Sequence, residues 1–204
     1  MSTASVPQLT PQQYLDIERK AAFKSEFFRG EMFAMAGASF QHNLIQANLI
    51  RRLAERLDGT ICRPVGSDQR VLVTATSLYT YSDVVIFCDP PQFSDKQLDT
   101  LLTPKVLIEI LSDSTEKYDR GTKSAHYRQI DSLQEYVLVS QSEPRVEVYQ
   151  RLPDGNWLLR EALSIDQSIT LASVGITLPL QEVYLRVEFP PVVPQTGEMR
   201  CSDP

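Results

Sequence analysis

The chain has 204 residues, which is enough for one good hydrophobic core and does not require a second domain. Charged residues make up 23% and apolar residues 42%, values that are ordinary for a soluble globular protein. The formal net charge of −6 argues against a protein that coats nucleic acid through bulk positive charge. A nucleic-acid enzyme is still compatible with this charge, because a local basic patch or a bound cation can offset it.

The cysteines and the first residues of the chain indicate the cellular compartment in which the protein is expected. Cys62, Cys88 and Cys201 show no short paired spacing, so the sequence predicts neither a zinc knuckle nor a disulfide framework. The first ten residues lack a charged segment followed by an apolar one, so no secretion signal is expected. No apolar run approaches the ~20 residues that span a bilayer. We therefore expect a cytoplasmic protein without a membrane segment.

Two helices and a hairpin are predicted in the first part of the chain. The sequence Thr10-Pro11-Gln12-Gln13 is a helix-start signal, and this helix should run to about Lys20. Residues 26–35 are expected to form two short strands around a turn at Arg29-Gly30. From Ser39, apolar residues recur every four positions until Gly59, which predicts a long amphipathic helix. Three strands should follow, at residues 61–65, 69–73 and 79–88.

The second part of the chain alternates strands with helical segments. A loop with a short helix near residues 97–102 is expected first, and then the apolar strand 106–111. The remaining predicted elements are a helix at 120–130, a strand at 135–139, an antiparallel hairpin at 145–161, a short strand at 169–171 and a helical turn at 179–184.

These elements predict an α/β fold, a mixed sheet flanked by helices with an antiparallel hairpin extension. The domain boundaries that we expect are a flexible tail at residues 1–9, a single domain at 10–188 and a proline-rich disordered tail at 189–204.

Two acids stand beside apolar strands. Glu109 lies inside the apolar run of residues 106–111, where an ionised carboxylate is costly unless a cation or donor meets it. Asp83 stands at the start of another apolar stretch. Neighbouring strands would bring both within reach of one cation, and carboxylate oxygens suit Mg²⁺. The alternative is that Asp83 caps a strand while Glu109 pairs with Lys105 or an arginine.

Several blocks of the sequence resemble one known family. The blocks are TYSDVVIFCDPP, PKVLIEILSDSTEKYDRGTKSAHYRQIDSLQEYVLVSQ, SEFFRGEMFAMAGASFQHNLIQANLIRRLAERL, GSDQRVLV and RVEVYQRLPDGNWLLRE. Taken in their order along the chain, they resemble the bacterial "putative restriction endonuclease" family of the PD-(D/E)XK nuclease superfamily. The resemblance covers about residues 12 to 186.

The resemblance implies a restriction-endonuclease-like fold and a metal-dependent endodeoxyribonuclease, a hydrolase acting on ester bonds. It implies that Asp83 and Glu109 are the two catalytic acids and the ligands of Mg²⁺, for which Mn²⁺ could substitute. The family motif places a lysine two residues after the second acid, but that position is Leu111 here. We expect Lys123, on the following helix, to take its place, orienting the attacking water and helping to deprotonate it.

Further site candidates follow from the matching blocks. Glu31 is the preferred additional acid, ahead of Glu26, and its alternative is a solvated hairpin residue. His42 falls in the first turn of the long helix, where most histidines are structural. Gln69 is expected to line the cleft. Asp119 is predicted to cap the helix that carries Lys123.

The expected partner is DNA, with a homodimer as a further possibility through the late hairpin. Arg51, Arg52 and Arg120 are the candidates for contacting DNA, although a solvated helix face is the commoner explanation of such residues. Two other functions stay open. One is a catalytically silent member that acts as a nucleic-acid-binding or regulatory module, and the other is a different magnesium-dependent phosphoryl-transfer enzyme.

Overall fold

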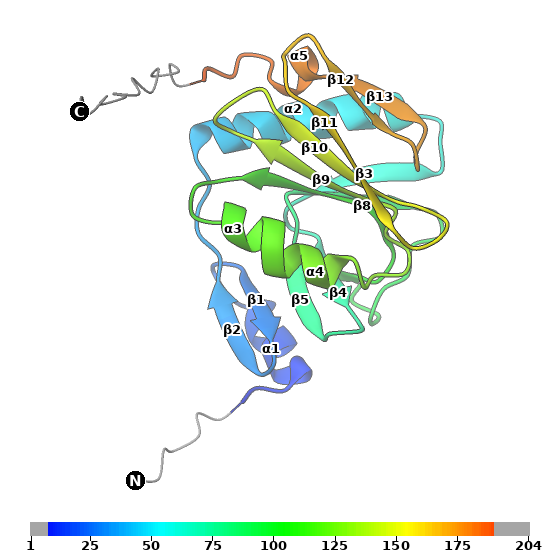
Figure 1. The fold of residues 1–204 in the computed structure, drawn as a ribbon. Helices are drawn as coiled ribbons and strands as arrows, with labels where there is room; N and C mark the ends of the chain where they lie inside the picture. The colour runs from blue at the N-terminus through cyan, green and yellow to red at the C-terminus, as the bar shows by residue number, and fades with distance from the viewer. Residues whose placement is uncertain (1–7, 190–204) are drawn as a thin grey trace, which may run out of the picture.

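The computed structural model describes residues 8–189. The predicted tails at 1–9 and 189–204 lie outside this range except for residues 8, 9 and 189, so their flexibility and disorder stay predictions. The described chain forms a mixed α/β structure in which a large sheet stands above a smaller one (Figure 1). The predicted α/β class is therefore confirmed.

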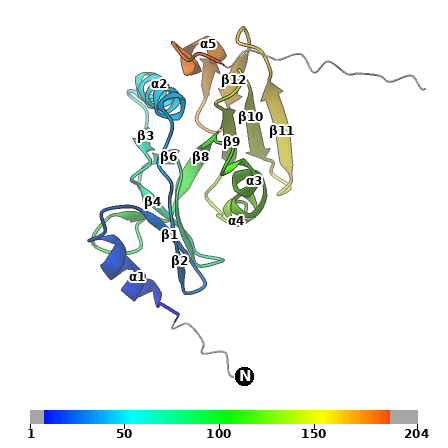
Figure 2. The same cartoon turned by 90° about the vertical axis from the view of Figure 1, so that its left-hand side faces the viewer.

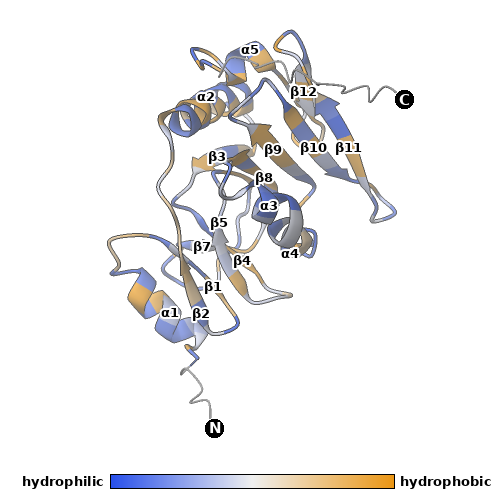
Figure 3. Ribbon diagram, turned by 60° about the vertical axis from the view of Figure 1, so that its left-hand side comes forward, coloured by the Kyte–Doolittle hydropathy of each residue, from blue (hydrophilic) through white to orange (hydrophobic). Residues whose placement is uncertain are grey.

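A six-stranded sheet forms the centre of the molecule. Only β8 and β9 run parallel, and every other neighbouring pair is antiparallel. Figure 3 shows the hydrophobic residues gathered on the strands in the middle of this sheet, as expected for strands buried on both faces. The strands in spatial order are β11 (Trp157–Ala162), β10 (Val146–Arg151), β9 (Glu135–Ser140), β8 (Pro104–Leu111), β6 (Val84–Cys88) and β3 (Cys62–Gly66).

Helical segments cover both faces of this sheet (Figure 2). The helix α2 (Phe40–Leu57) packs on one face together with β12 (Ser168–Leu171), β13 (Ile176–Pro179) and α5 (Leu180–Val183). Alternate residues of β8 point to opposite faces, so Ile108 and Ile110 join this core. Leu107 and Leu111 join the other core, and Glu109 belongs by parity to that second face.

One continuous helical segment covers the second face. It consists of α3 (Glu116–Tyr118), a π-helical turn η1 (Asp119–Lys123) and α4 (Ser124–Tyr127). The segment begins four residues before the predicted helix, and its N-cap position is Thr115. The predicted cap Asp119 is instead a buried residue within the segment, only 3% exposed. The cap prediction is therefore wrong, because the turn at residues 112–115 already starts the helix.

The smaller sheet has five strands and packs with α1 (Pro11–Glu18). Thr10 and Gln13 form the predicted capping box of α1. The predicted turn at Arg29-Gly30 is confirmed, with φ of 50° and 87°, and a Cβ at Gly30 would lie 2.6 Å from Gln8 Cβ. The strands in spatial order are β2 (Glu31–Ala34), β1 (Ser25–Phe28), β5 (Leu78–Tyr81), β4 (Arg70–Val73) and β7 (Thr100–Leu101).

The predicted strand at 79–88 is in fact two strands. β5 ends at Tyr81 and belongs to the small sheet, whereas β6 starts at Val84 and belongs to the large sheet. Ser82 and Asp83 link the two sheets. The predicted helix near residues 97–102 is also wrong, because Thr100 and Leu101 pair with β4 as β7.

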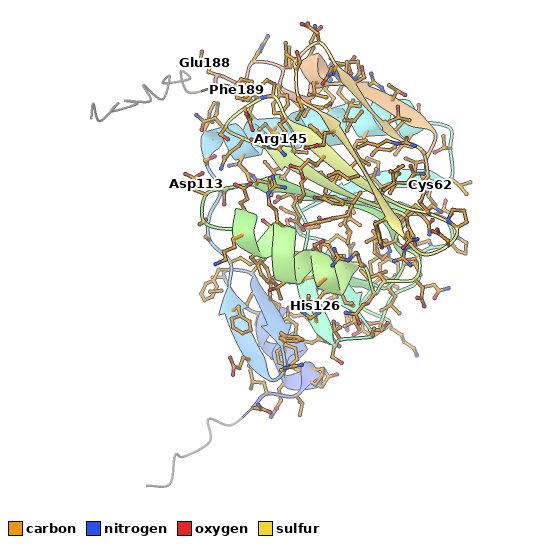
Figure 4. All side chains as sticks on the ribbon, viewed as in Figure 1. Cys62, Asp113, His126, Arg145, Glu188 and Phe189 are labelled. Carbon is orange, nitrogen blue, oxygen red and sulfur yellow. A yellow bond between two sulfur atoms is a disulfide. The ribbon has the colours of Figure 1, made fainter. Side chains whose placement is uncertain are left out.

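The expectation of no disulfide is wrong as well. β3 and β6 pair antiparallel with Cys62 directly opposite Cys88, and the two residues form a disulfide. β3 is an edge strand of the large sheet, and Figure 4 shows Cys62 toward the right-hand side of the molecule. In residues 8–189, no helix has the length and apolar character needed to cross a membrane.

Candidate active site

The topology brings Asp83 and Glu109 together. Strands β6 and β8 pair antiparallel with Val84 opposite Ile108, which places the preceding Asp83 beside Glu109. The backbone N–H of Ile110 donates a hydrogen bond to Asp83 Oδ2 at 2.7 Å. The two acids that the sequence places on separate strands therefore share one end of the large sheet, where the loop after β8 and the amino end of α2 also lie (Figure 1).

Lys123 enters this site from the helical segment. Its Nζ lies 3.1 Å from Glu109 Oε1, 3.5 Å from Glu26 Oε1 and 3.7 Å from Asp119 Oδ1. It also donates a hydrogen bond to the carbonyl of Tyr81 at 2.9 Å. The ammonium group thus occupies the place that the sequence assigned to it, against the second acid, although it comes from a different element than the motif lysine.

Glu26, and not Glu31, is the additional acid of the site. The Glu26 carboxylate is buried on β1 and accepts hydrogen bonds from Thr80 Oγ1 and, at 2.8 Å, from Tyr118 Oη. Glu31 is exposed on the edge strand β2 and has no contact with the cluster. Both residues belong to the same hairpin block of the sequence. Glu26 is buried because β1 pairs with β5 inside the small sheet, whereas Glu31 is exposed because β2 forms the edge of that sheet.

His42 contacts the first acid from α2. Its Nε2 lies 3.1 Å from Asp83 Oδ2, and its Nδ1 is buried without a partner among the described residues. One turn later, Gln46 Nε2 donates to the carbonyl oxygen of Asp83 at 2.7 Å. The N-terminal half of α2 therefore holds both the side chain and the backbone of Asp83.

Two tyrosines that sequence reasoning did not assign to the site hold its glutamates. Tyr127 donates from its hydroxyl to Glu109 Oε1 at 2.8 Å, and Tyr118 donates to Glu26. In the π turn, residues five apart share a side, which lets Tyr118 and Lys123 both face the carboxylates. In the sequence, Tyr127 follows Lys123 by four positions, which places both on one side of the predicted helix. That spacing was the only indication that either tyrosine could belong to the site.

Burial sets the ionisation of the cluster. Burial raises the pKa of Glu109 to about 8, Asp119 and Asp83 add to the rise, and Lys123 opposes it. Burial also raises the pKa of Asp119. Burial alone would lower the pKa of Lys123, but Glu109, Glu26 and Asp119 outweigh it and raise that pKa well above its usual value. Lys123 therefore stays charged near neutral pH, whereas Glu109 retains a proton for part of the time.

The donor set fits a hard divalent cation. Three carboxylates, those of Glu109, Glu26 and Asp119, lie 3.1 to 3.7 Å from the single ammonium group of Lys123, and Asp83 stands beside Glu109. Asp83 Oδ1 and Glu109 Oε2 receive no hydrogen bond from the described residues. Mg²⁺ typically uses one or two carboxylates and completes its shell with water. Residues 8–189 contain no group of three or more His, Cys, Asp or Glu side chains arranged to hold a metal, so Mg²⁺ binding stays a prediction.

The candidate DNA-contacting arginines are engaged within the chain. Arg51 and Arg52 pair with Glu55 on the exposed face of α2. Arg120 forms two hydrogen bonds, of 2.6 and 2.7 Å, with the buried Glu147. The role of these arginines in DNA contact stays a prediction, and Arg120 is the least suited because its guanidinium is already bound. Gln69 lies outside the carboxylate cluster and lines a hollow beside α2.

The sequence matches a known family over most of its length. Residues 11–181 match the profile of the Uma2 family, which is described as "Putative restriction endonuclease". The chain belongs to the Uma2 family. Two relatives from Synechocystis sp. carry the description "Uncharacterized protein". One, slr1290, is 34% identical over 92% of this chain and 97% of its own length, and the other, sll1609, is 35% identical over 86% and 99%.

A solved structure shares the Uma2 chain's fold. It is the crystal structure of "a putative nuclease belonging to DUF820" from Anabaena variabilis, with a TM-score of 0.69 and 17% identity, covering 85% of this chain and 96% of that one. At this identity the likeness establishes the fold alone. The restriction-endonuclease-like family that the sequence resembles is confirmed by the Uma2 match.

Proposed function

We propose that this Uma2 chain is a Mg²⁺-dependent endodeoxyribonuclease that hydrolyses phosphodiester bonds in DNA. The observation that carries the proposal is the contact of 3.1 Å between Lys123 Nζ and Glu109 Oε1, beside Asp83. In the family motif the lysine stands two residues after the second acid, where this chain has Leu111. Here Lys123 of the helical segment supplies the ammonium group beside Glu109 of β8 instead. Family membership supports the same reaction class.

Each residue has a distinct part in the proposed reaction. Asp83 and Glu109 would hold Mg²⁺ through their free oxygens, Asp83 Oδ1 and Glu109 Oε2, and Mn²⁺ could replace it. When bound, the metal supplies a water of lowered pKa and stabilises charge on the phosphate oxygens. His42 fixes the orientation of Asp83 by contacting Oδ2.

Lys123 acts in this proposal as a fixed positive charge. Because its pKa is raised, it holds its proton near neutral pH and donates hydrogen bonds to the attacking water or to a phosphate oxygen. This differs from the deprotonating role expected from the sequence. Glu26, anchored by Thr80 and Tyr118, lies 3.5 Å from Lys123 Nζ and helps to balance its charge.

Plasmid cleavage tests the proposal. The wild-type protein should nick supercoiled DNA with Mg²⁺ or Mn²⁺, and Asp83→Asn or Glu109→Gln should reduce the rate at least about 100-fold, the scale of losing one preorganised electrostatic group. Glu31→Gln is the matched control, since this exposed acid lies in the same hairpin as Glu26 but outside the cluster.

A silent, DNA-binding member would give a different pattern. Such a protein would retain DNA without added metal and release no product, and the two acid variants would bind DNA as well as the wild type. If no form of DNA is cut with either metal while the protein remains folded, the nuclease proposal fails.

A homodimer through the late hairpin is supported by the edge of the large sheet. β11 is an outer strand with one unpaired edge, and Leu158 and Leu159 on it are 39% and 42% exposed. Light scattering of the purified protein would determine the oligomeric state, and Leu159→Glu should convert such a dimer to a monomer.

A further inference from the structure

A hollow of about 510 Å³ lies next to the carboxylate cluster and has no part in the reaction described above. Its lining includes Gln46 and Ile50 of α2 and Val65, Gly66 and Gln69 around the turn between β3 and β4. The volume falls in the range of small-molecule sites. Gly66 lies opposite Val84, the residue after Asp83, so the hollow begins close to the first catalytic acid.

One face of α2 runs from the candidate active site into this hollow. His42 contacts the side chain of Asp83, Gln46 contacts its carbonyl, and Ile50 lines the hollow. Successive members of this series are four residues apart, a rise of about 6 Å along the helix. A group bound at Ile50 is therefore about two such steps from His42, close enough to belong to the same substrate.

The lining excludes phosphate as the occupant. Its eight residues include no lysine or arginine, and two of them, Asp68 and Asp99, are acids. Asp99 is already paired with Arg19 and Arg70, at 2.7 and 2.9 Å. A phosphate would meet acidic groups without a free cation, which is unfavourable.

The side chains that remain free are oriented hydrogen-bond acceptors. Gln46 Nε2 donates to the carbonyl of Asp83, and Gln69 Nε2 donates to the carbonyls of Arg70 and Asp99 at 3.0 and 3.1 Å. These bonds fix which end of each amide carries oxygen, and neither Oε1 receives a donor from the described residues. Ile50 and Val65 add apolar surface on which a planar group can lie.

We propose that this hollow binds an unpaired nucleobase that carries an exocyclic amino group, from the nucleotide next to the cleaved phosphodiester. The amino group of adenine, cytosine or guanine has two N–H donors, one for each glutamine oxygen, whereas thymine has no amino group and can offer only its single N3–H. Turning such a base out of a duplex requires only a few kcal/mol, and a single strand presents it directly. The link to cleavage rests on the proposed nuclease function, but binding of the base does not.

Nucleoside binding tests the hollow without catalysis. In NMR spectra of the ¹⁵N-labelled full chain, 2′-deoxycytidine or 2′-deoxyadenosine should shift the side-chain amide signals of Gln46 and Gln69, and thymidine should bind at least about fivefold more weakly. Ile50→Trp and Ser67→Trp, two separate ways of filling the hollow, should abolish the shifts. Leu163→Trp is the control, an equal change at a residue that is 60% exposed and outside the lining.

Cleavage of a DNA pool with randomised bases gives the second readout. Sequencing of the product ends should show an excess of amino-bearing bases at one position beside the cut, and in whatever product Ile50→Trp still forms that bias should fall below about twofold. Cleavage without any bias, together with no nucleoside binding, would overturn the base site and leave the nuclease intact. Nucleoside binding with no cleavage would overturn the nuclease and keep the base site. Equal binding of thymidine would overturn the proposed amino-group recognition.

Discussion

Glu109 is a buried carboxyl whose ionisation is coupled to folding. Burial raises its pKa to about 8 in the folded chain, against 4.5 as its ordinary value. Between these two pH values the folded state binds more protons than the unfolded state. The contribution of Glu109 to stability is therefore greatest at low pH and is lost as pH rises from about 4.5 to about 8.

Comparison with Glu109→Gln tests this pH dependence. The free energy of unfolding of the wild type should fall relative to that of the variant as pH rises through this window, by up to about 1.4 kcal/mol per pH unit. Added Mg²⁺ should restore wild-type stability at pH 8 and have little effect on the variant, because metal binding requires the ionised carboxylate. Chemical denaturation at a series of pH values measures both effects. Parallel stability curves for the two proteins would contradict the raised pKa.

At the scale of elements, the helical segment over β8 positions the site. The π turn between α3 and α4 carries Lys123, and the tyrosines on either side of it bind the two glutamates. Tyr127 is fully buried and packs edge-on against Tyr136, with ring centroids 5.3 Å apart. This packing fixes the hydroxyl that donates to Glu109, so we regard Tyr127 as a positioning residue.

Tyr127→Phe should weaken metal binding by changing Glu109. The lost hydrogen bond lowers the pKa of Glu109 in the wild type, so the variant should need a higher pH to bind Mn²⁺, with affinity at pH 7 reduced up to about tenfold. Calorimetric titration at several pH values measures the shift. Tyr184→Phe is the control, because that buried hydroxyl donates to the carbonyls of Ser140 and Arg145 away from the site. A loss of stability in both variants with unchanged metal affinity would assign Tyr127 a purely structural role.

Element types were easier to predict than their partners. The long helix α2 and the hairpin β10–β11 follow directly from apolar periodicity and turn residues, because those signals are local. The sequence predicted one strand from Tyr79 to Cys88, although the polar pair Ser82 and Asp83 stands in its middle. That break occurs because β5 and β6 pair with strands of different sheets, which is a long-range choice.

At the scale of the whole molecule, the Cys62–Cys88 disulfide joins β6 to the edge strand β3. The two cysteines are 26 residues apart, and closing a loop of this size typically adds about 2–4 kcal/mol of stability. Alkylation of the unfolded, unreduced chain should therefore label one of its three cysteines, and all three after reduction. Mass spectrometry gives the count, and three labels without reductant would contradict the bond.

Serine variants test the contribution of this bond to stability. Cys62→Ser or Cys88→Ser should lower the free energy of unfolding by about 2–4 kcal/mol, and reductant should have little further effect on either variant. Cys201→Ser, outside the described residues, is the control. Disulfides are uncommon in reducing compartments such as the cytoplasm. The cytoplasmic location therefore stays a prediction, and the redox state of Cys62 and Cys88 in cells would test it.

The sequence alone determined the α/β class and the main helices and hairpins, and it predicted Asp83, Glu109 and Lys123 as residues of the site. It did so because apolar periodicity, caps and an acid within an apolar strand are local features, and because the matching family blocks extend over most of the chain. Only the tertiary structure decided that Glu26 and not Glu31 joins the site, that Asp119 is buried beside Lys123, and that Tyr118 and Tyr127 hold the glutamates. Those choices depend on strand order, on the π turn and on which face of a strand packs inward, and all three arise from contacts between residues far apart in the chain.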